Sequence, residues 1–465
     1  MRRMFTTALL PLLVAAAPAD PAIERVLADA GPGTRIGMIV ADEAGREIVA
    51  IRPDDRFVPA SNTKMFTTAA AAALLDQADG GGAGVRLEGR DVILVGGGDA
   101  RLSSAPDCVV DCLIDLARAV AARTRVVGDV IGDDSAFPDE RWPAGMSWNN
   151  MVTRSGTAVS ALTIDDNVVA ISVRADGTAA SIAGDGYYRI DGRVTVGGTK
   201  AALDVARMPA SDVLRVTGTV PANATETLTV AVDDPAHRAA WRLADMLRRL
   251  GVRVNGRIAV RHRPLSLADD PERRGSAPAA RPPAAPTLTR LVAPPLADTL
   301  RVTNKVSQNL YAELLLRRVG AVRGTGSVAD GRAAVVAMLT GAGVPRWGYD
   351  FADGSGMSSY NRVSPRATVG FLRWTQSQPW GAAWRATLPA GGVDGTLARR
   401  FRGTVLEGKV FAKTGTLNAA NALSGFVTAA SGRTLTFSIL ANDMPADVSA
   451  TATIDKALLA VAAAN

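Results

Sequence analysis

Helix and strand patterns recur at both ends of the chain, and this arrangement most constrains the fold. Residues 35–58 alternate in two apolar runs around a turn at 42–45, which predicts a hairpin, and an Ala-rich helix follows from Thr63. Residues 296–465 read as helices and then strands with hairpin turns, before a final Ala-rich helix. The middle is β-rich, apart from an amphipathic helix at 235–251. We therefore predict one α/β domain built from both chain ends, with the middle inserted.

A proline-rich segment marks a connection that leads from one domain back to another. Eight of the 25 prolines lie between Pro264 and Pro295, a composition typical of an extended connection. The chain has 465 residues, too many for one ordinary core, so two or three domains are expected.

The N-terminus has the order of features found in secretory signals. Arg2 and Arg3 precede a short apolar run, and Ala17-Pro18-Ala19 fits a cleavage site, so residues 1–19 are predicted to be a signal peptide. No later segment has the roughly 18 consecutive apolar residues of a membrane span, so no transmembrane anchor is expected. The sequence predicts an exported protein.

Composition excludes several classes of function. The net charge of +7 falls to +5 when Arg2 and Arg3 leave, and interleaved acidic residues make nucleic acid an improbable partner. The chain has two histidines, His237 and His262, and two cysteines, and these four residues do not have the spacing of a metal site. No metal or cofactor is therefore expected. Cys108 and Cys112 could be bridged or free, and both states remain open.

Lysine is scarce in this chain, and its positions are informative. Six lysines stand against 46 arginines, and Lys64 follows Ser61 by three residues in Ser-Asn-Thr-Lys. Ser307-Gln308-Asn309 and Lys413-Thr414-Gly415 follow in order, with both serines predicted at helix starts and Lys413 at the end of a strand. Together these motifs are typical of active-site serine β-lactamases and penicillin-binding proteins.

The residue types fit nucleophilic catalysis by serine. A serine hydroxyl needs an adjacent base, and Lys64, three residues after Ser61, shares its helix face. A lysine can lose its proton whereas an arginine cannot, but its pKa of about 10.4 must first be lowered. Burial and a second cation, for which Lys413 is the candidate, would lower it. No Gly-x-Ser-x-Gly motif is present, and the two histidines lie in Arg-rich contexts, so a Ser-His-Asp triad is poorly supported.

The sequence resembles the D-Ala-D-Ala carboxypeptidase/endopeptidase family of low-molecular-mass penicillin-binding proteins in its three-domain form. The resemblance covers nearly the whole mature chain, and the 246 residues from Ser61 to Ser307 match that family's long insertion. It rests on these segments: "VPASNTKMFTTAAA", "LVGGGDARL", "DDSAFPDERWPAGMSWNNM", "NKVSQNLYAELLLR", "DGSGMSSYNRVSP" and "LPAGGVDGTLARRF…GKVFAKTGTL".

The resemblance implies a fold and its division. It implies an α/β (α+β) fold with a β-lactamase/transpeptidase-like domain, in which helices flank an antiparallel sheet, and β-rich domains inserted between the first two motifs. The catalytic domain would comprise residues 20–84 and 290–465. Residues 85–165 and 233–289 would form inserted domain II, and residues 166–232 inserted β-rich domain III.

The resemblance also implies the catalytic roles. Ser61 would be the nucleophile and Lys64 its base. Ser307 would relay a proton to the departing D-Ala amine, and Asn309 would hold Lys64 and the substrate amide. Lys413 would receive the terminal carboxylate.

Substrate contacts are implied along the third motif. Thr414, Gly415 and Thr416 would line the substrate, and the backbone N–H groups of Ser61 and Thr416 would form the oxyanion hole. Each such donor contributes about 3 kcal/mol in other acyl-transfer enzymes.

The chain departs from the family after "DGSGMS". Family members often carry arginine where Ser359 stands, and Arg362, three residues later, is the candidate substitute for binding the free end of the peptide stem. Asp139 and Glu140 are candidates for the amine of the stem-peptide side chain, although solvated loop acids are an equal alternative.

The function implied is a serine D-alanyl-D-alanine carboxypeptidase of peptidoglycan stem peptides, which acts through an acyl-enzyme and is acylated by β-lactam antibiotics. D,D-endopeptidase activity at the same site is a further expectation. The enzyme would be periplasmic or otherwise extracytoplasmic and associated with the cell wall. The alternatives are a β-lactamase or esterase with the same site, and a non-catalytic wall-binding protein.

Overall fold

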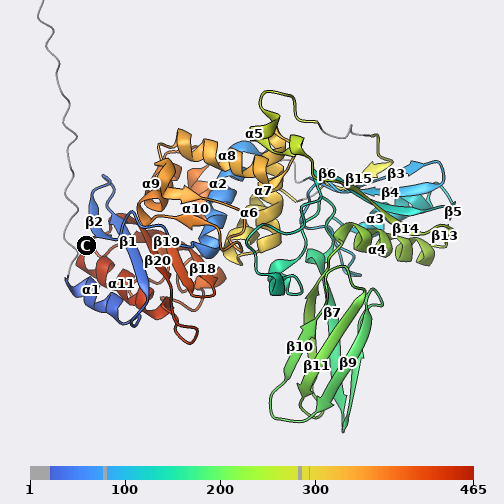
Figure 1. Cartoon of the computed structure of the whole chain (residues 1–465), viewed down its shortest axis with the longest axis horizontal. Coiled ribbons are helices and arrows are strands. Elements are labelled where there is room, and N and C mark those ends of the chain that lie inside the picture. Colours follow the sequence, from blue (N-terminus) through green and yellow to red (C-terminus); the bar gives the residue numbers. More distant parts are fainter. Residues whose placement is uncertain (1–20, 77–80, 281–284, 293) are drawn as a thin grey trace, which may run out of the picture.

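The computed structural model describes residues 21–76, 81–280, 285–292 and 294–465. The predicted signal peptide, residues 1–19, lies outside the described residues. Figure 1 shows three lobes: a helix-covered sheet made from both chain ends, a second mixed lobe beside it, and a narrow β-lobe that projects from their junction.

The first lobe is built on a five-stranded antiparallel sheet in the order β18-β19-β20-β1-β2. Its strands are β1 (Arg35–Ala41), β2 (Glu47–Ile51), β18 (Val410–Leu417), β19 (Ala420–Thr428) and β20 (Thr434–Asn442). Ile36 pairs with Ala441, so the two chain ends form one sheet. The predicted hairpin and the predicted antiparallel sheet flanked by helices are confirmed.

Helices cover both faces of this sheet. One face packs on α1 (Pro21–Ala28) and α11 (Thr451–Ala464). The other face packs on a larger group: α2 (Thr63–Leu74), α6 (Leu296–Lys305), α7 (Asn309–Arg323), α8 (Val328–Gly341), α9 (Pro365–Gln376) and α10 (Gly381–Ala386). Along β19, Ala422 and Phe426 face one core while Leu423 and Val427 face the other. This alternation is the two-residue period of a strand buried on both faces.

Side-chain caps fix where several of these helices begin. Ser327 accepts a hydrogen bond from the backbone N–H of Asp330 at the start of α8, and Ser364 does so from Ala367 at the start of α9. Pro365 occupies the first turn of α9, where its missing N–H costs nothing.

The second lobe contains a mixed five-stranded sheet in the order β14-β6-β4-β3-β15. Its strands are β3 (Gly84–Glu88), β4 (Asp91–Val95), β6 (Val130–Pro138), β14 (Ile258–Arg263) and β15 (Thr289–Arg290), with a short parallel pair, β5 (Val126–Val127) and β13 (Arg253–Val254). Two helices share its core, α3 (Leu113–Ala121) and α4 (Pro235–Arg249). The predicted helix α4 is confirmed, whereas α3 was not predicted: its nine residues are too short to stand out among β-rich runs.

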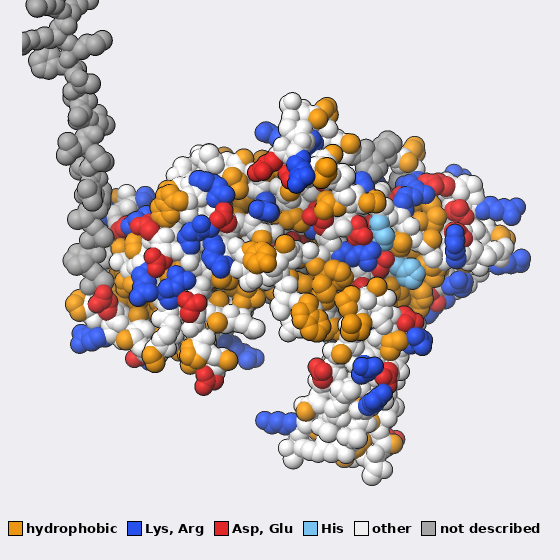
Figure 2. Space-filling model, viewed as in Figure 1, with side chains coloured by type: hydrophobic (Ala, Val, Ile, Leu, Met, Phe, Trp, Pro, Cys, Tyr) orange, Lys and Arg blue, Asp and Glu red, His pale blue; other side chains and the backbone are white. Residues whose placement is uncertain are grey.

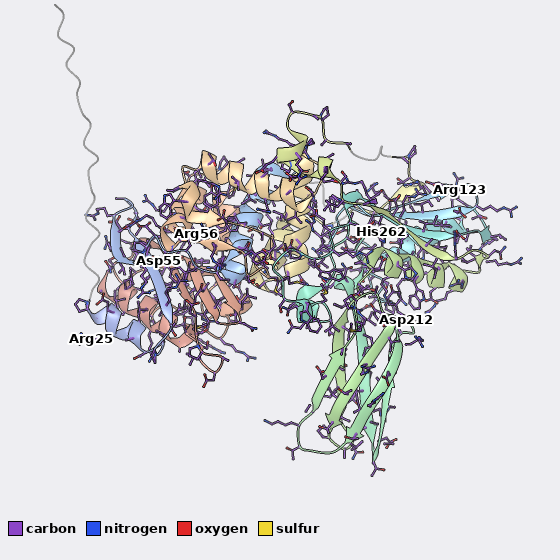
Figure 3. The ribbon with its side chains drawn as sticks, in the orientation of Figure 1. Arg25, Asp55, Arg56, Arg123, Asp212 and His262 are labelled. Atoms are coloured by element: carbon purple, nitrogen blue, oxygen red, sulfur yellow. A yellow bond between two sulfur atoms is a disulfide. The ribbon has the colours of Figure 1, made fainter. Side chains whose placement is uncertain are left out.

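The projecting β-lobe consists of two three-stranded sheets, β10-β11-β9 and β12-β7-β8, around one apolar core. The strands are β7 (Val168–Asp176), β8 (Ala179–Ala183), β9 (Arg189–Val196), β10 (Ala202–Ala206), β11 (Val213–Val220) and β12 (Thr225–Ala231). Figure 3 places Asp212, in the loop before β11, at the end of this lobe nearest the rest of the molecule.

Cys108 and Cys112 form a disulfide, with their Cα atoms 5.7 Å apart. They lie in the loop that leads into α3 rather than within a helix, so the backbone can bring them together. Within the described residues, no helix is long and apolar enough to span a membrane, and no cluster of three or more His, Cys, Asp or Glu side chains is placed to hold a metal ion.

Candidate active site

The first motif lies at the start of α2, against the edge of the main sheet. Ser61 is in a short 3-10 turn, η1 (Ala60–Asn62), which continues directly into α2. Ala60 has a φ of 48°, a conformation that costs a non-glycine residue energy and is typical of functional sites. Ser61 therefore projects from a constrained turn rather than from the regular helix.

Lys64 is the centre of the site. Its Nζ lies 2.9 Å from Ser61 Oγ, 2.6 Å from Asn309 Oδ1 and 2.6 Å from the carbonyl oxygen of Ser355. The side chain is fully buried, and burial lowers the pKa of Lys64 to about 7, although the carboxylates of Asp353 and Glu313 act in the opposite direction.

The second motif is brought to the same place by α6 and α7. Ser307 sits between these helices with a φ of 64°, and its Oγ accepts a hydrogen bond from Lys413 Nζ at 2.9 Å. Asn309 is the first residue of α7 and uses both ends of its amide: Oδ1 faces Lys64, and Nδ2 donates to the carbonyl of Ser155 at 2.8 Å. One of the inserted segments therefore reaches the site directly.

Lys413 lies in the middle of β18, not at the end of a strand as predicted from the sequence. The strand continues because Gly415 lets it pass close to η1: a Cβ at Gly415 would lie 2.6 Å from the carbonyl oxygen of Pro59. Burial, and then the charge of Lys64, lower the pKa of Lys413 well below its usual value. The predicted effect of Lys413 on the pKa of Lys64 is not seen, since burial is the cause that lowers it.

β18 is the edge strand of the main sheet, and residues 389–391 bridge the start of its outer edge. The N–H of Ala412 points away from β19, because it donates to Pro389 O at 3.0 Å. In a strand every second N–H points the same way, so the N–H of Thr416 also points away from β19. Thr416 is exposed, and the hydroxyl of Thr414 contacts that of Thr396 at 2.7 Å.

A second layer of buried carboxylates supports Lys64, and this layer was not predicted. Glu313 Oε1 accepts the backbone N–H groups of Gly354 and Ser355, at 3.0 and 2.8 Å. Asp353 accepts those of Gly356 and Ser358, at 2.9 and 2.7 Å. These bonds hold the loop 353–358 so that the carbonyl of Ser355 meets Lys64.

A sequence signal for Glu313 did exist. Asn309, Glu313 and Arg317 recur every four residues along α7, so they share one face of an otherwise apolar helix. The side chains of Glu313 and Arg317 are both buried. Burial, and then the charge of Asp353, raises the pKa of the Glu313 carboxyl group. A column of polar residues inside an apolar helix is typical of a functional site.

The remaining predicted residues already have protein partners. Asp139 pairs with Arg141 at 2.8 Å, and Glu140 accepts the N–H of Val328 at 3.0 Å. Arg362 folds back to donate to backbone carbonyls of its own loop, including that of Asn361 at 2.8 Å. The assignment of these three residues to the peptide stem stays a prediction.

Neither histidine approaches Ser61. His262 lies in the second lobe (Figure 3), where its ring nitrogens face Asp134 and Asp234 at 2.9 and 3.1 Å. Hydrogen bonds to these carboxylates raise the pKa of His262 to about 10, so it is a charged structural group at neutral pH. His237 contacts the hydroxyl of Tyr187 at 3.1 Å.

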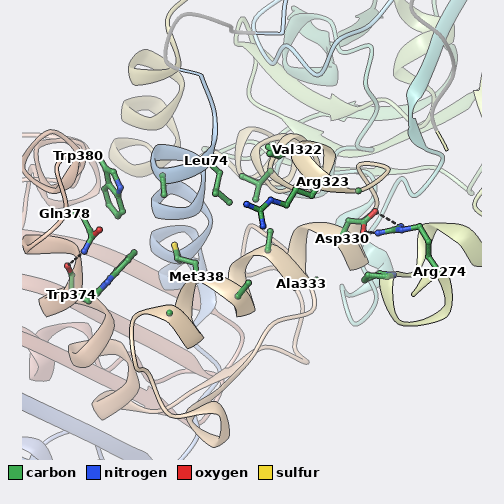
Figure 4. Close-up of a pocket in the computed structure, with 18 residues that line it drawn as sticks. Leu74, Arg274, Val322, Arg323, Asp330, Ala333, Met338, Trp374, Gln378 and Trp380 are labelled. Carbon is green, nitrogen blue, oxygen red and sulfur yellow. Dashed lines mark hydrogen bonds and ion pairs between the residues drawn. The ribbon is translucent and has the colours of Figure 1, made fainter. Parts of the chain in front are cut away.

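A cavity of about 630 Å³ lies at the opposite ends of α2 and α7 from the predicted site (Figure 4). Its lining includes Leu74, Val322, Met338, Trp374 and Trp380, and none of the predicted site residues. Size alone therefore does not identify the site in this molecule.

Comparisons with known proteins agree with one another. The model of the D-Ala-D-Ala carboxypeptidase 3 (S13) family matches residues 19–465. A D-alanyl-D-alanine carboxypeptidase from Actinomadura sp. (strain R39) is 33% identical, over 91% of this chain and 79% of the relative. The D-alanyl-D-alanine carboxypeptidase DacB of Haemophilus influenzae is 26% identical, over 87% and 85%.

Solved structures share the fold. The crystal structure of penicillin binding protein 4 from Haemophilus influenzae matches with a TM-score of 0.79 at 22% identity, and it covers 94% of this chain and 98% of that one. The same protein complexed with a β-lactam matches with a TM-score of 0.75 at 23% identity.

Proposed function

Because the chain belongs to the D-Ala-D-Ala carboxypeptidase 3 (S13) family, we propose that its serine-type carboxypeptidase reaction takes place at Ser61, with Lys64 as the base. The observation that carries this proposal is the set of acceptors around Lys64 Nζ. The substrate is the D-Ala-D-Ala end of a peptidoglycan stem peptide.

The contacts of Lys64 suit a neutral amine. The oxygens of Asn309 and Ser355 can only accept hydrogen bonds, so they take the two N–H groups of an uncharged Nζ. The nitrogen lone pair is then left for the hydroxyl of Ser61, 2.9 Å away. With a pKa of about 7, a large fraction of Lys64 is in this form at neutral pH.

The reaction follows from this geometry. Ser61 Oγ attacks the carbonyl carbon between the two D-Ala residues while its proton passes to Lys64. The oxyanion is stabilised by the N–H groups of Ser61 and Thr416, which together contribute several kcal/mol. The C–N bond then breaks, the leaving amine takes a proton through Ser307, and water hydrolyses the Ser61 ester.

The role of Lys413 is to bind the terminal carboxylate of the substrate, beside Thr414 and Gly415. Burial, and then repulsion from the charge of Lys64, lowers the pKa of Lys413. An incoming carboxylate supplies the opposite charge and favours the protonated form of Lys413. Lys64 then stays neutral and acts as the base, while Lys413 is the cation that binds the carboxylate.

Glu313 and Asp353 act on the reaction through Lys64. They hold the loop whose Ser355 carbonyl fixes the direction of Nζ, and their charge keeps the pKa of Lys64 from falling further. Glu313 is therefore a positioning residue.

Replacing Glu313 with glutamine tests this role through the pH profile. Glutamine keeps an oxygen for the N–H groups of Gly354 and Ser355 but removes a charge that raises the pKa of Lys64. Lys64 then loses its proton at lower pH, and the rising limb of acylation by a chromogenic β-lactam, near pH 7 in the wild type, moves down by less than about one pH unit, because Glu313, whose pKa is raised to about 7, carries only part of its charge there. The exposed Glu272, changed to glutamine, is the control and leaves the limb in place. A limb that stays or moves to higher pH in the Glu313 variant contradicts this role.

We propose that the enzyme acts outside the cytoplasm, in the periplasm or at the wall. The basic and apolar order of residues 1–19 supports export. The Cys108–Cys112 disulfide is an independent support, because disulfides persist in oxidising compartments.

The carboxypeptidase activity is tested by release of D-Ala from a stem pentapeptide. Wild-type enzyme releases D-Ala and Ser61→Ala does not. A crosslinked peptide dimer, offered in parallel, measures endopeptidase activity at the same site. Penicillin turnover separates a β-lactamase, which hydrolyses it rapidly, from a carboxypeptidase, which releases it slowly because the leaving group stays tethered. Failure to release D-Ala from any peptide would contradict the proposal.

A further inference from the structure

A second cavity, of about 460 Å³, lies where the β-lobe meets the rest of the molecule. One wall is the segment 148–153, and the other is formed by residues 204–211, which are the end of β10 and the loop that follows it. Figure 2 shows hydrophobic side chains gathered on the surface in this junction. Its volume is within the range of about 300–1,000 Å³ that is usual for small-molecule sites.

The cavity combines exposed apolar groups with polar ones. Trp148 is 71% exposed and Met208 is 72% exposed, which is unusual for residues of this size and type. Between them the lining contains Asn149, Asp204 and Ser211. Asp204 is exposed and has no ion-pair partner among the described residues, so its carboxylate is available to a ligand.

The loop that carries Met208 is anchored by contacts of Arg207 and Asp233. Arg207, whose side chain is 1% exposed, pairs with Asp233 and donates to the carbonyl of Ala231 at 2.7 Å. Asp233 in turn accepts the N–H of Ala210 at 3.0 Å. An exposed methionine on an anchored loop is a preformed contact surface, which binds a ligand without first being ordered.

The opposite wall continues into the active site. Trp148 begins the 3-10 turn η2 (Trp148–Asn150), and Ser155 lies in the next turn, η3 (Arg154–Gly156). The carbonyl of Ser155 accepts the hydrogen bond from Asn309 Nδ2. The seven residues from Trp148 to Ser155 span at most about 25 Å, and less because of the two turns. One short segment therefore joins the wall of the cavity to the hydrogen bond of Asn309 in the active site.

We propose that this cavity binds an N-acetylated sugar of the glycan strand that carries the stem peptide. The proposal rests on the proposed function, because it concerns the other half of the same substrate. A pyranose ring presents a face of C–H groups that stacks on an indole, and its acetamido methyl group needs an apolar contact such as Met208. Its hydroxyl groups can donate to the carboxylate of Asp204 and accept from Asn149 Nδ2 and from the hydroxyl of Ser211, whereas Asn149 Oδ1 and Ser211 Oγ already accept hydrogen bonds from Ser147 Oγ and from the N–H of Val213. A protein partner would instead require a broader apolar surface than one cavity with two exposed apolar side chains.

The test uses two substrates with the same reacting end, a free stem pentapeptide and the disaccharide-linked pentapeptide. Trp148→Ala lowers kcat/KM for D-Ala release from the disaccharide-linked substrate by about five- to tenfold and leaves the free peptide within about twofold. The control is Trp347→Ala, since Trp347 is also exposed, at 51%, but does not line the cavity; it leaves both substrates unchanged. Equal loss on both substrates, or no loss on either, overturns the proposal.

A binding measurement separates this inference from the carboxypeptidase mechanism. Peptide-free glycan strands are titrated into the wild type and into Trp148→Ala, each also carrying Ser61→Ala so that no reaction occurs. Binding by the first and its loss in the second supports the sugar site even if the assignment of Ser61 fails. Equal binding by both, or no binding by either, overturns the sugar site while leaving the mechanism at Ser61 intact.

Discussion

Replacing Lys64 with arginine lowers the rate of Ser61 acylation by about 10²- to 10⁴-fold, the usual contribution of a general base. The positive charge remains, but a guanidinium cannot give up its proton at neutral pH. Lys64 has the contacts of a neutral amine, with Asn309 and Ser355 taking its two N–H groups, and the arginine has no lone pair to offer Ser61. The measurement is the second-order rate constant for acylation by a chromogenic β-lactam.

The control for this substitution is Lys409→Arg, at an exposed position just before β18. It leaves the rate unchanged. The melting temperature of the Lys64 variant shows whether the longer side chain disturbs the buried site. A folded Lys64→Arg enzyme with near-normal acylation would refute the assignment of Lys64 as the base.

Replacing Asn309 with aspartate, a change of nearly the same shape, reduces acylation at pH 7 by about 10- to 1,000-fold. The Oδ1 atom of Asn309 is 2.6 Å from Lys64 Nζ, and a carboxylate there holds the proton on the lysine. Because this substitution raises the pKa of Lys64 from about 7, deprotonation requires a more alkaline solution. The rate should therefore recover as the pH rises.

Recovery with pH distinguishes this effect from loss of the Asn309 side chain as a substrate contact. The acylation rate is measured from about pH 6 to about pH 10, over which Lys64 would change its protonation state in the variant. A rate depressed by the same factor at every pH would contradict the electrostatic explanation. Glu313→Gln and Asn309→Asp should move the same limb in opposite directions.

The three motifs could be recognised in the sequence because the chemistry expected of them depends on residue type. In a chain that uses arginine almost throughout, Lys64 and Lys413 mark positions where arginine does not serve, and the structure places both beside serine hydroxyls. The hairpin of β1 and β2 was predictable from its alternation, and α2 from its alanines. Local patterns therefore predicted α2, which carries Lys64, and the hairpin that joins the same sheet as β18.

The features that were missed depend on contacts between distant segments. Glu313 touches the loop after Asp353, forty residues away, and no local pattern reveals that pairing. Lys413 was placed at a strand end, but Gly415 instead allows β18 to continue and to pass η1 closely. The Cys108–Cys112 bridge could not be decided, because it depends on a loop whose shape is set by its surroundings.

The division into domains stays a prediction at the level of residue boundaries, and so do the roles of Asp139, Glu140 and Arg362. Chain topology explains the difficulty. The second lobe is assembled from strands as distant as β3 and β15, so its limits are set by pairing across some 200 residues rather than by any local signal.

The central claim is that Ser61 is the nucleophile, and covalent labelling tests it most directly. The mature enzyme is incubated with a β-lactam, digested, and its peptides weighed by mass spectrometry. The account predicts one added β-lactam mass on the peptide that contains Ser61, and none in Ser61→Ala. An adduct on another residue, an adduct that persists in Ser61→Ala, or no adduct at all would contradict it.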